Sequence, residues 1–203
     1  MSKKLIIVFE GIEGSGKSHH INNIAKYLKK KNKQFIQIRE PGGSKNSEKI
    51  RNLILNNKST FNKYTDLLLY LSARSENIEL IKKNIGKKII LIDRFTDSTI
   101  AYQHYGMGIN LKFIKDVNNF LLKNIRIDFT FLNTVSPKNM EHRLNARKNL
   151  NRYDKFNNNF YNRVQKGFIK ILKKNPKKYL QINSNMPIEH NEKIILNKIN
   201  ELI

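Results

Sequence analysis

The sequence contains no cysteine, and it has only 9 glycines and 4 prolines among its 203 residues. Without cysteine the chain forms neither a disulfide framework nor a zinc–thiolate site, and it has no thiol nucleophile. Acidic residues are also few, because 16 Asp and Glu stand against 39 Lys and Arg and leave a net charge of +23. This balance excludes an acidic disordered tail and favours an anionic partner, which is a nucleotide, a nucleic acid or a membrane surface.

Long hydrophobic runs and linkers are missing as well. The longest aliphatic run, residues 5–9, is far shorter than a membrane span and too short for the apolar part of a signal peptide. We therefore expect a soluble, cytoplasmic protein without a membrane partner. No linker rich in proline, glycine or serine divides the chain, and its length and 39% hydrophobic content predict one domain over residues 1–203.

The basic excess has an alternative source in the composition of the gene. The chain has 30 Lys, 29 Asn and 28 Ile, but only 9 Arg and 4 Ala. Lysine, asparagine and isoleucine are encoded by A/T-rich codons, so a biased genome would supply surface lysines without any anionic ligand. The arginines are therefore better candidates for binding residues than the lysines.

Short apolar segments alternate with amphipathic ones along the whole chain. The apolar segments predict strands at 5–9, 35–38, 89–92, 128–132 and 179–182. The amphipathic segments predict helices at 18–31, 63–83, 111–122, 137–146, 159–173 and 187–203. Strands separated by helices favour right-handed crossovers, so we expect an α/β fold with three layers and a five-stranded parallel sheet.

A complete phosphate-binding motif, Gly-x-x-x-x-Gly-Lys-Ser, follows the first predicted strand at residues 11–18. Its glycines allow the backbone N–H groups to turn inward and form an anion site at a helix N-terminus. Lys17 would reach the β- and γ-phosphates of a nucleoside triphosphate, and the hydroxyl of Ser18 would bind Mg²⁺. The predicted triphosphate-binding residues, which the family resemblance given below makes the ATP site, are Gly11, Ile12, Glu13, Gly14, Ser15, Gly16, Lys17 and Ser18.

The motif alone does not define the reaction. GTPases would need Asn-Lys-x-Asp and Asp-x-x-Gly strings, which do not occur in this chain, and motor or helicase ATPases are usually larger. A small P-loop phosphotransferase remains. Asp93 ends a run of four aliphatic residues, which is the position of a second magnesium-binding side chain. Five histidines invite a general-base hypothesis, but a phosphate acceptor is already ionised at neutral pH and needs no base.

Three further segments lie near the predicted strand ends: Arg-Glu-Pro-Gly-Gly at 39–43, Tyr-Leu-Ser-Ala-Arg at 70–74, and Asp-Arg-Phe at 93–95 followed by Ala-Tyr-Gln at 101–103. Together with the phosphate loop, these motifs resemble the thymidylate kinase family, the P-loop kinases that convert dTMP to dTDP with ATP and Mg²⁺. The resemblance runs from about residue 5 to about residue 163. It departs from the family pattern at Asn77, where a histidine is usual.

The resemblance implies an acceptor site for dTMP. Tyr70 would stack on thymine while Arg74, one helical turn later, donates to a thymine carbonyl. Gln103 would read the pyrimidine edge. Tyr102 and Glu13 would contact the sugar. The full set of implied dTMP-binding residues is Glu13, Arg39, Arg51, Tyr70, Arg74, Arg94, Ser98, Thr99, Tyr102 and Gln103. For Ser98 and Thr99, capping of a helix start is an equal alternative.

The resemblance also implies the catalytic charges. Arg94 would clamp the dTMP phosphate, with Arg51 and, more weakly, Arg39 beside it; exposed arginine is the alternative for Arg39. Residues 143–156 resemble a mobile lid. The predicted catalytic residues are Lys17, Arg94 and the lid arginines Arg143, Arg147 and Arg152. A solvated helix face is the alternative for the lid.

Two other functions remain open at this stage. One is a P-loop kinase for another nucleoside monophosphate or for a nucleoside. The other is a basic nucleic-acid-binding protein, which rests on the net charge of +23 alone and lacks a recognisable motif. The family resemblance further implies a homodimer packed through helices near the dTMP site.

Overall fold

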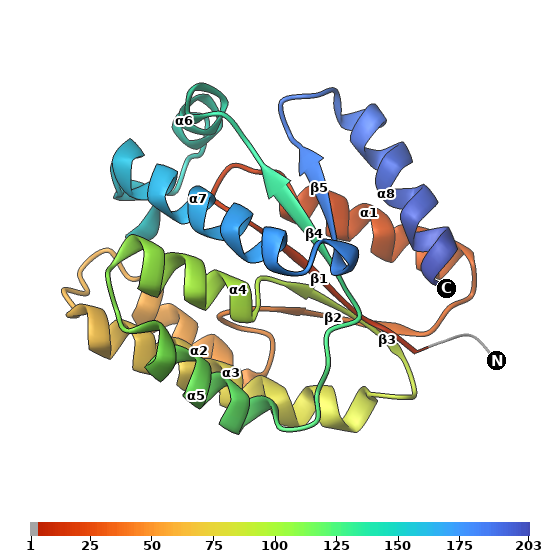
Figure 1. Cartoon of the computed structure of the whole chain (residues 1–203), viewed down its shortest axis with the longest axis horizontal. Coiled ribbons are helices and arrows are strands. Elements are labelled where there is room, and N and C mark those ends of the chain that lie inside the picture. The colour runs from red at the N-terminus through yellow and green to blue at the C-terminus, as the bar shows by residue number, and fades with distance from the viewer. Residues whose placement is uncertain (1–3) are drawn as a thin grey trace.

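The computed structural model describes residues 4–203 and contains one five-stranded parallel sheet (Figure 1). The strand order is β2-β3-β1-β4-β5, and the bounds are β1 (Ile6–Gly11), β2 (Phe35–Arg39), β3 (Ile89–Asp93), β4 (Phe129–Thr134) and β5 (Tyr179–Asn183). All five predicted strands are present, and each runs one or two residues further than predicted at its carboxyl end. The predicted fold class is therefore confirmed.

Helices cover both faces of the sheet, which explains why residues 6–9 of β1 are all apolar. Ile7 and Phe9 of β1 pack against α1 (Lys17–Lys30) and α8 (Ile188–Leu202) on one face. Ile6 and Val8 point to the opposite face, where they pack against α3 (Lys63–Asn84). Alternate residues of a strand point to opposite faces, so a strand buried on both sides is apolar at successive positions. The exception is Glu10, which is buried near the carboxyl end of β1.

The remaining predicted helices are α5 (Leu111–Leu122), α6 (Pro137–Asn145) and α7 (Asn158–Lys174). Helix α6 begins as the sequence indicates, because the Ser136 side chain accepts a hydrogen bond from the Asn139 amide and Pro137 occupies the first turn. His19 and His20 lie on the first turn of α1, as expected.

Three helical segments near the strand ends were not predicted. Helix α2 (Lys45–Leu55) buries only Ser47 and Ile54, so its apolar signal is weak. A short helix α4 (Thr96–Thr99) runs directly into a π-helix, Ile100–Gly106. A π-helix has a wider period than the 3.6 residues on which helix prediction rests, and it is frequent at functional sites. In residues 4–203, none of the helices combines the length and the apolar character that a membrane crossing requires.

Candidate functional site

The loop between β1 and α1 has the backbone conformation that its glycines permit. Gly11, Gly14 and Gly16 have φ values of 141°, 68° and 82°. A Cβ atom on Gly11 would lie 2.2 Å from the Asn133 carbonyl oxygen, so no larger residue fits there. The loop leads into the N-terminus of α1, where free backbone N–H groups attract anions.

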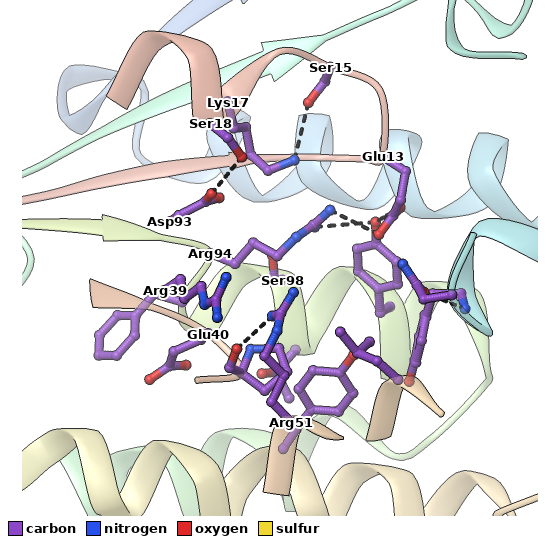
Figure 2. Close-up of a pocket in the computed structure, with 18 of the residues that line it drawn as sticks. Glu13, Ser15, Lys17, Ser18, Arg39, Glu40, Arg51, Asp93, Arg94 and Ser98 are labelled. Atoms are coloured by element: carbon purple, nitrogen blue, oxygen red, sulfur yellow. Dashed lines mark hydrogen bonds and ion pairs between the residues drawn. The ribbon is translucent and has the colours of Figure 1, made fainter. Parts of the chain in front are cut away.

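Lys17 lies inside this loop with its ammonium group turned onto the loop backbone (Figure 2). Its Nζ donates hydrogen bonds to the Ile12 carbonyl oxygen at 2.8 Å and to Ser15 Oγ at 3.3 Å. Burial, together with the nearby charge of Arg94, lowers the pKa of Lys17 to about 7. A bound polyphosphate would reverse this effect, because a nearby anion stabilises the ammonium form.

The Ser18 hydroxyl and the Asp93 carboxylate lie together at the adjoining ends of α1 and β3. Ser18 Oγ donates to Asp93 Oδ2 at 3.0 Å (Figure 2). The other carboxylate oxygen, Asp93 Oδ1, is buried and has no hydrogen-bond partner among residues 4–203. Hydroxyl and carboxylate oxygens are the ligands that Mg²⁺ prefers, so these two residues fit the predicted metal.

A cavity of about 320 Å³ opens beside the phosphate loop, bounded by the ends of β2 and β3, by α3 and by the π-helix. Its volume is in the range of small-molecule sites. All of the predicted site residues line it except Gly11, Ile12, Arg143 and Arg152. The motifs that are scattered along the sequence therefore meet in one place.

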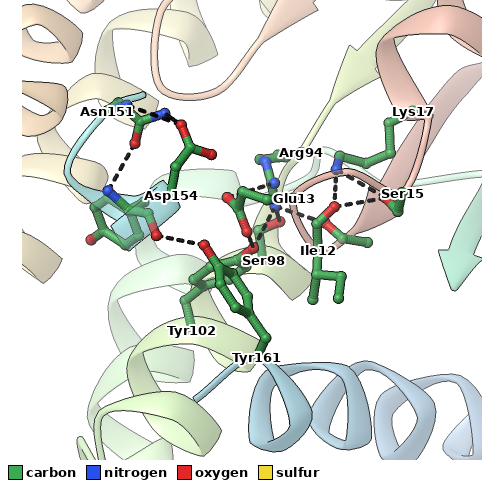
Figure 3. A network of polar contacts seen from close by, with 12 residues as sticks. Ile12, Glu13, Ser15, Lys17, Arg94, Ser98, Tyr102, Asn151, Asp154 and Tyr161 are labelled. Atoms are coloured by element: carbon green, nitrogen blue, oxygen red, sulfur yellow. Dashed lines mark hydrogen bonds and ion pairs between the residues drawn. The ribbon is translucent and has the colours of Figure 1, made fainter. Parts of the chain in front are cut away.

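Arg94 is the centre of this cavity's charge network (Figures 2 and 3). Its Nη2 donates to Glu13 Oε1 at 2.9 Å, and its Nη1 donates to the Gly11 carbonyl oxygen at 2.8 Å. The Tyr102 hydroxyl donates to Glu13 Oε2. Burial raises the pKa of Glu13, but Arg94, Lys17 and the Tyr102 hydroxyl outweigh it and hold that pKa below its ordinary value.

The backbone at Arg94 is strained, with φ at 66° in the left-handed region that favours glycine. Glu10 supports this turn from below: Glu10 Oε1 accepts from the Phe95 amide at 2.8 Å and from the Ser98 amide at 3.2 Å. The Ser98 hydroxyl donates to Glu10 Oε2. Burial, together with the neighbouring charge of Asp97, raises the pKa of Glu10 to about 7.

The opposite end of the cavity is formed by α3 and the π-helix. Arg74 is fully buried, with Nε 2.9 Å from Glu40 Oε2 and Nη1 2.6 Å from Asn118 Oδ1. Gln103 Nε2 and Thr99 Oγ1 are buried without a partner among the described residues. Unpaired buried polar atoms are costly, so their presence in a cavity indicates a polar ligand.

Helix capping is the wrong interpretation of Ser98 and Thr99. Helix α4 begins at Thr96, and its N-cap residue is Phe95. Ser98 instead holds Glu10, and Thr99 lines the cavity.

Arg39 and Arg51 lie at the edge of the cavity near the end of β2. Arg39 donates to Glu48 at 2.9 Å and is more than half exposed, whereas Arg51 Nη1 donates to the Pro41 carbonyl oxygen at 2.7 Å. Arg147 reaches the cavity from the lid and pairs with the buried Asp154 at 2.8 Å.

The two remaining lid arginines do not line the cavity. Arg143 lies behind the phosphate loop, where it donates to the Gly14 carbonyl oxygen at 2.9 Å and to the Ser184 carbonyl oxygen at 2.6 Å. Arg152 points away from the loop and pairs with Asp66 of α3. Neither arginine reaches the cavity in this structure, so the expected contact of Arg143 and Arg152 with phosphate stays a prediction.

Seven lining residues were not predicted: His19, Glu40, Pro41, Leu55, Phe95, Asn151 and Tyr153. Glu40 lies inside the Arg-Glu-Pro-Gly-Gly motif, so its pairing with Arg74 could have been inferred from the need to neutralise a buried guanidinium. Asn77 also supports the site, because Nδ2 donates to the Gly42 carbonyl oxygen at 2.7 Å and Oδ1 accepts from the Ser44 amide. No pattern in the sequence signals Tyr153.

The sheet, the phosphate loop and the arginine-lined cavity define a P-loop kinase. The family model described as thymidylate kinase matches residues 9–195. The chain therefore belongs to the thymidylate kinase family and is an enzyme of that family.

Individual relatives agree with this assignment. The chain is 37% identical to a thymidylate kinase of Mycoplasma capricolum over 97% of both chains. It is 39% identical to one of Thermosipho africanus over 83% of this chain and 85% of that one. Among solved structures, the thymidylate kinase from Ehrlichia chaffeensis is similar, with a TM-score of 0.79 and 32% identity over 98% of this chain and 99% of that chain.

Proposed function

We propose that this protein transfers the γ-phosphoryl group of ATP to the phosphate of dTMP and releases dTDP and ADP for dTTP synthesis in the cytoplasm. The observation that carries the proposal is the position of Arg94. It lies between the phosphate loop and the π-helix, in a cavity that also holds buried polar atoms of Thr99 and Gln103 with no partner among residues 4–203. One cavity thus offers a phosphate clamp at one end and a polar surface for a base at the other.

On the donor side, the amides of residues 11–18 would bind the phosphates of ATP, and Lys17 would leave the Ile12 carbonyl oxygen to contact the β- and γ-phosphates. Ser18 and Asp93 would hold Mg²⁺, which supplies charge neutralisation for the triphosphate. Arg143 fixes the loop from behind by bridging Gly14 to Ser184.

On the acceptor side, Tyr70 would contact the thymine ring and Gln103 its polar edge. Arg74 would present its remaining donors while Glu40 and Asn118 hold the guanidinium in place. Glu13 and Tyr102 lie together beside Arg94, where the sugar would meet the phosphate. Arg51 and Arg39 would complete the phosphate site at the cavity edge.

The reaction itself would need no general base. The second pKa of a phosphate monoester is about 6, so an acceptor oxygen is already ionised at neutral pH. That oxygen forms the new bond to the γ-phosphorus, and the bond to the bridging oxygen breaks so that ADP leaves with the electron pair. Lys17, Arg94 and Arg147 would balance the charge on the transferring group, and lid closure would exclude water.

A comparison of acceptors tests the proposal and separates it from kinases for other monophosphates. ADP release is measured with dTMP, dUMP, dCMP, dGMP and AMP at equal concentrations. We expect the highest kcat/KM with dTMP. A higher kcat/KM for another monophosphate, or DNA binding without any turnover of dTMP, would refute it.

The Lys17→Ala variant tests the role of the phosphate loop in the reaction. Its side chain is buried, and within the described residues its hydrogen bonds go to the phosphate loop alone. We therefore expect transfer to fall by a factor of about 100 or more while the fold survives. Circular dichroism checks the fold, and ADP release checks the reaction. Near-normal turnover would contradict the role of the loop.

A further inference from the structure

Helix α3 carries three chemically distinct residues on one face. Asp66, Tyr70 and Arg74 follow one another at four-residue spacing, which places them in a row along the helix. Tyr70 and Arg74 line the cavity. Asp66, in the first turn of the helix, lies at the end of this row and is almost completely buried.

Both carboxylate oxygens of Asp66 are held by neighbouring residues of the lid. Oδ1 pairs with the Arg152 guanidinium, and Oδ2 accepts from the Tyr153 hydroxyl at 2.9 Å. The side chains of Asp66 and Arg152 are only 3% and 16% exposed, so this is not a solvated surface ion pair. Such a buried pair leaves an uncompensated charge when one partner is removed.

Further contacts fix the same part of the lid to the acceptor half of the site. Arg152 Nε donates to the Ile54 carbonyl oxygen of α2 at 3.1 Å. The Tyr153 ring lies edge-on to Tyr70 at 5.8 Å and to Tyr102 at 6.1 Å. In the view of Figure 3, Asn151 and Asp154 of the lid lie on the opposite side of Glu13 and Arg94 from Lys17 and Ser15. The lid therefore makes two contacts: Arg147 lines the cavity, and Arg152 pairs with Asp66 of α3.

We propose that Asp66 is a positioning residue that holds the lid, residues 143–156, onto α3. Arg152 then contributes to the reaction by keeping the lid in place, and it does not contact a phosphate group. The proposal rests on the proposed function for its link to dTMP. Because Tyr153 of the lid contacts both Asp66 and Tyr70, an acceptor bound against Tyr70 and a docked lid stabilise each other. Lid docking and dTMP binding are then coupled, and Arg147 is placed in the cavity when both have occurred.

Trypsin cleavage within the lid tests this contact independently of activity. Residues 143–156 contain Arg147, Lys148, Arg152 and Lys155, which become cleavable when the segment undocks. We compare Asp66→Asn, Arg152→Gln and the double variant with the unaltered protein. The matched control is Glu79→Gln, which removes an exposed acid from the same helix.

Both single variants should increase cleavage at Arg147 and Lys148 about tenfold, which corresponds to about 1.4 kcal/mol of lost docking. The effect of the double variant should be smaller than the sum of the two single effects, because both single variants break the same Asp66–Arg152 ion pair. The Glu79→Gln variant should match the unaltered protein. In the kinase assay, KM for dTMP should rise more than kcat falls in both single variants.

A phosphate-binding role for Arg152 gives a different pattern and would overturn the proposal. In that case Arg152→Gln lowers kcat strongly, lid cleavage is unchanged, and Asp66→Asn has little effect. If Arg152→Gln makes trypsin cleave throughout the chain and not mainly in the lid, the proposal is also overturned, because Arg152 would then support the whole fold. If Asp66→Asn does not fold, Arg152→Gln alone decides. If dTMP is not a substrate, the proposed function fails while the cleavage comparison still tests the docking.

Discussion

Arg74 and Gln103 line the same cavity, but their polar groups are satisfied in opposite ways. Arg74 is bonded to Glu40 and Asn118 and is fully enclosed. Gln103 Nε2 is buried and has no partner among residues 4–203. Removing Arg74 therefore damages the folded protein itself, whereas removing the Gln103 amide takes away a group that the protein alone does not use.

The two residues should consequently separate stability from binding. We expect Arg74→Ala to lower the free energy of unfolding by about 3–5 kcal/mol, because Glu40 is left buried and unpaired. Gln103→Leu should change that free energy by less than about 1.5 kcal/mol but raise KM for dTMP. Urea unfolding and acceptor kinetics measure both effects. A large loss of stability in Gln103→Leu would show that its amide has a structural role.

Glu10 and Lys17 make stability depend on pH in two separate windows. The pKa of Glu10 is raised from 4.5 to about 7, so the folded protein binds more protons than the unfolded chain between these values. Stability should then fall as pH rises from about 4.5 to 7. The pKa of Lys17 is lowered from 10.5 to about 7, so its contribution should rise with pH above 7.

The Glu10→Gln variant tests the lower window. Because glutamine does not titrate, the decrease in unfolding free energy between pH 5 and pH 7 should be smaller in this variant. Urea midpoints at four pH values measure the difference, and Glu79→Gln, an exposed acid, serves as the control. An equal slope in Glu10→Gln and the unaltered protein would contradict the raised pKa.

At the scale of the elements, the π-helix and α7 approach each other unusually closely. A Cβ atom on Gly167 of α7 would lie 2.5 Å from Tyr105 Cδ2, and one on Gly106 would lie 2.7 Å from Phe160 Cε2. The π-helix also carries Tyr102 and Gln103. Gly106 and Gly167 therefore allow the π-helix to pack closely against α7, and this packing fixes the position of Tyr102 and Gln103 in the cavity.

Gly167→Ala should be destabilising although alanine is the better helix former. Its intrinsic gain is about 1 kcal/mol, and the clash with Tyr105 should outweigh it, for a net loss of about 1–2 kcal/mol. We also expect a higher KM for dTMP, because the displaced π-helix moves Gln103. Lys166→Ala, at an exposed position of the same helix, is the control. A stabilised Gly167→Ala protein would refute the close packing.

These elements also explain how much the sequence could predict. The buried strands, the phosphate loop and six helices follow from apolar periodicity and glycine spacing, which are local properties. The π-helix and α2 do not, because the first has another period and the second buries little apolar surface. The destination of Arg152 depends on Asp66, 86 residues away, and no local pattern records such a contact.

At the scale of the whole molecule, the positive charge is unevenly placed. Helix α3 carries no lysine between Lys63 and Lys82, although the chain has 30 lysines. Its exposed residues in this interval are apolar, small or acidic: Tyr64, Leu68, Ser72, Ser75, Glu76 and Glu79. The neighbouring α5 exposes Phe113 and Phe120, and α2 exposes Leu53. Figure 1 shows these three helices together below the sheet.

The homodimer that the family resemblance implies stays a prediction, and this face is where we expect the second copy of the chain to bind. Two molecules of charge +23 repel each other, so a contact between them requires an area that is low in lysine and rich in apolar side chains. If the unaltered protein forms this expected dimer, Leu68→Glu, at a position 54% exposed, should give a folded monomer. Ile188→Glu is the control, because Ile188 is 49% exposed on α8, across the sheet from α3. Sedimentation velocity distinguishes the two states, and a Leu68→Glu protein that remains dimeric would place the interface elsewhere.

Because Tyr70 and Arg74 lie on the opposite side of the same helix, loss of the second copy should also raise KM for dTMP.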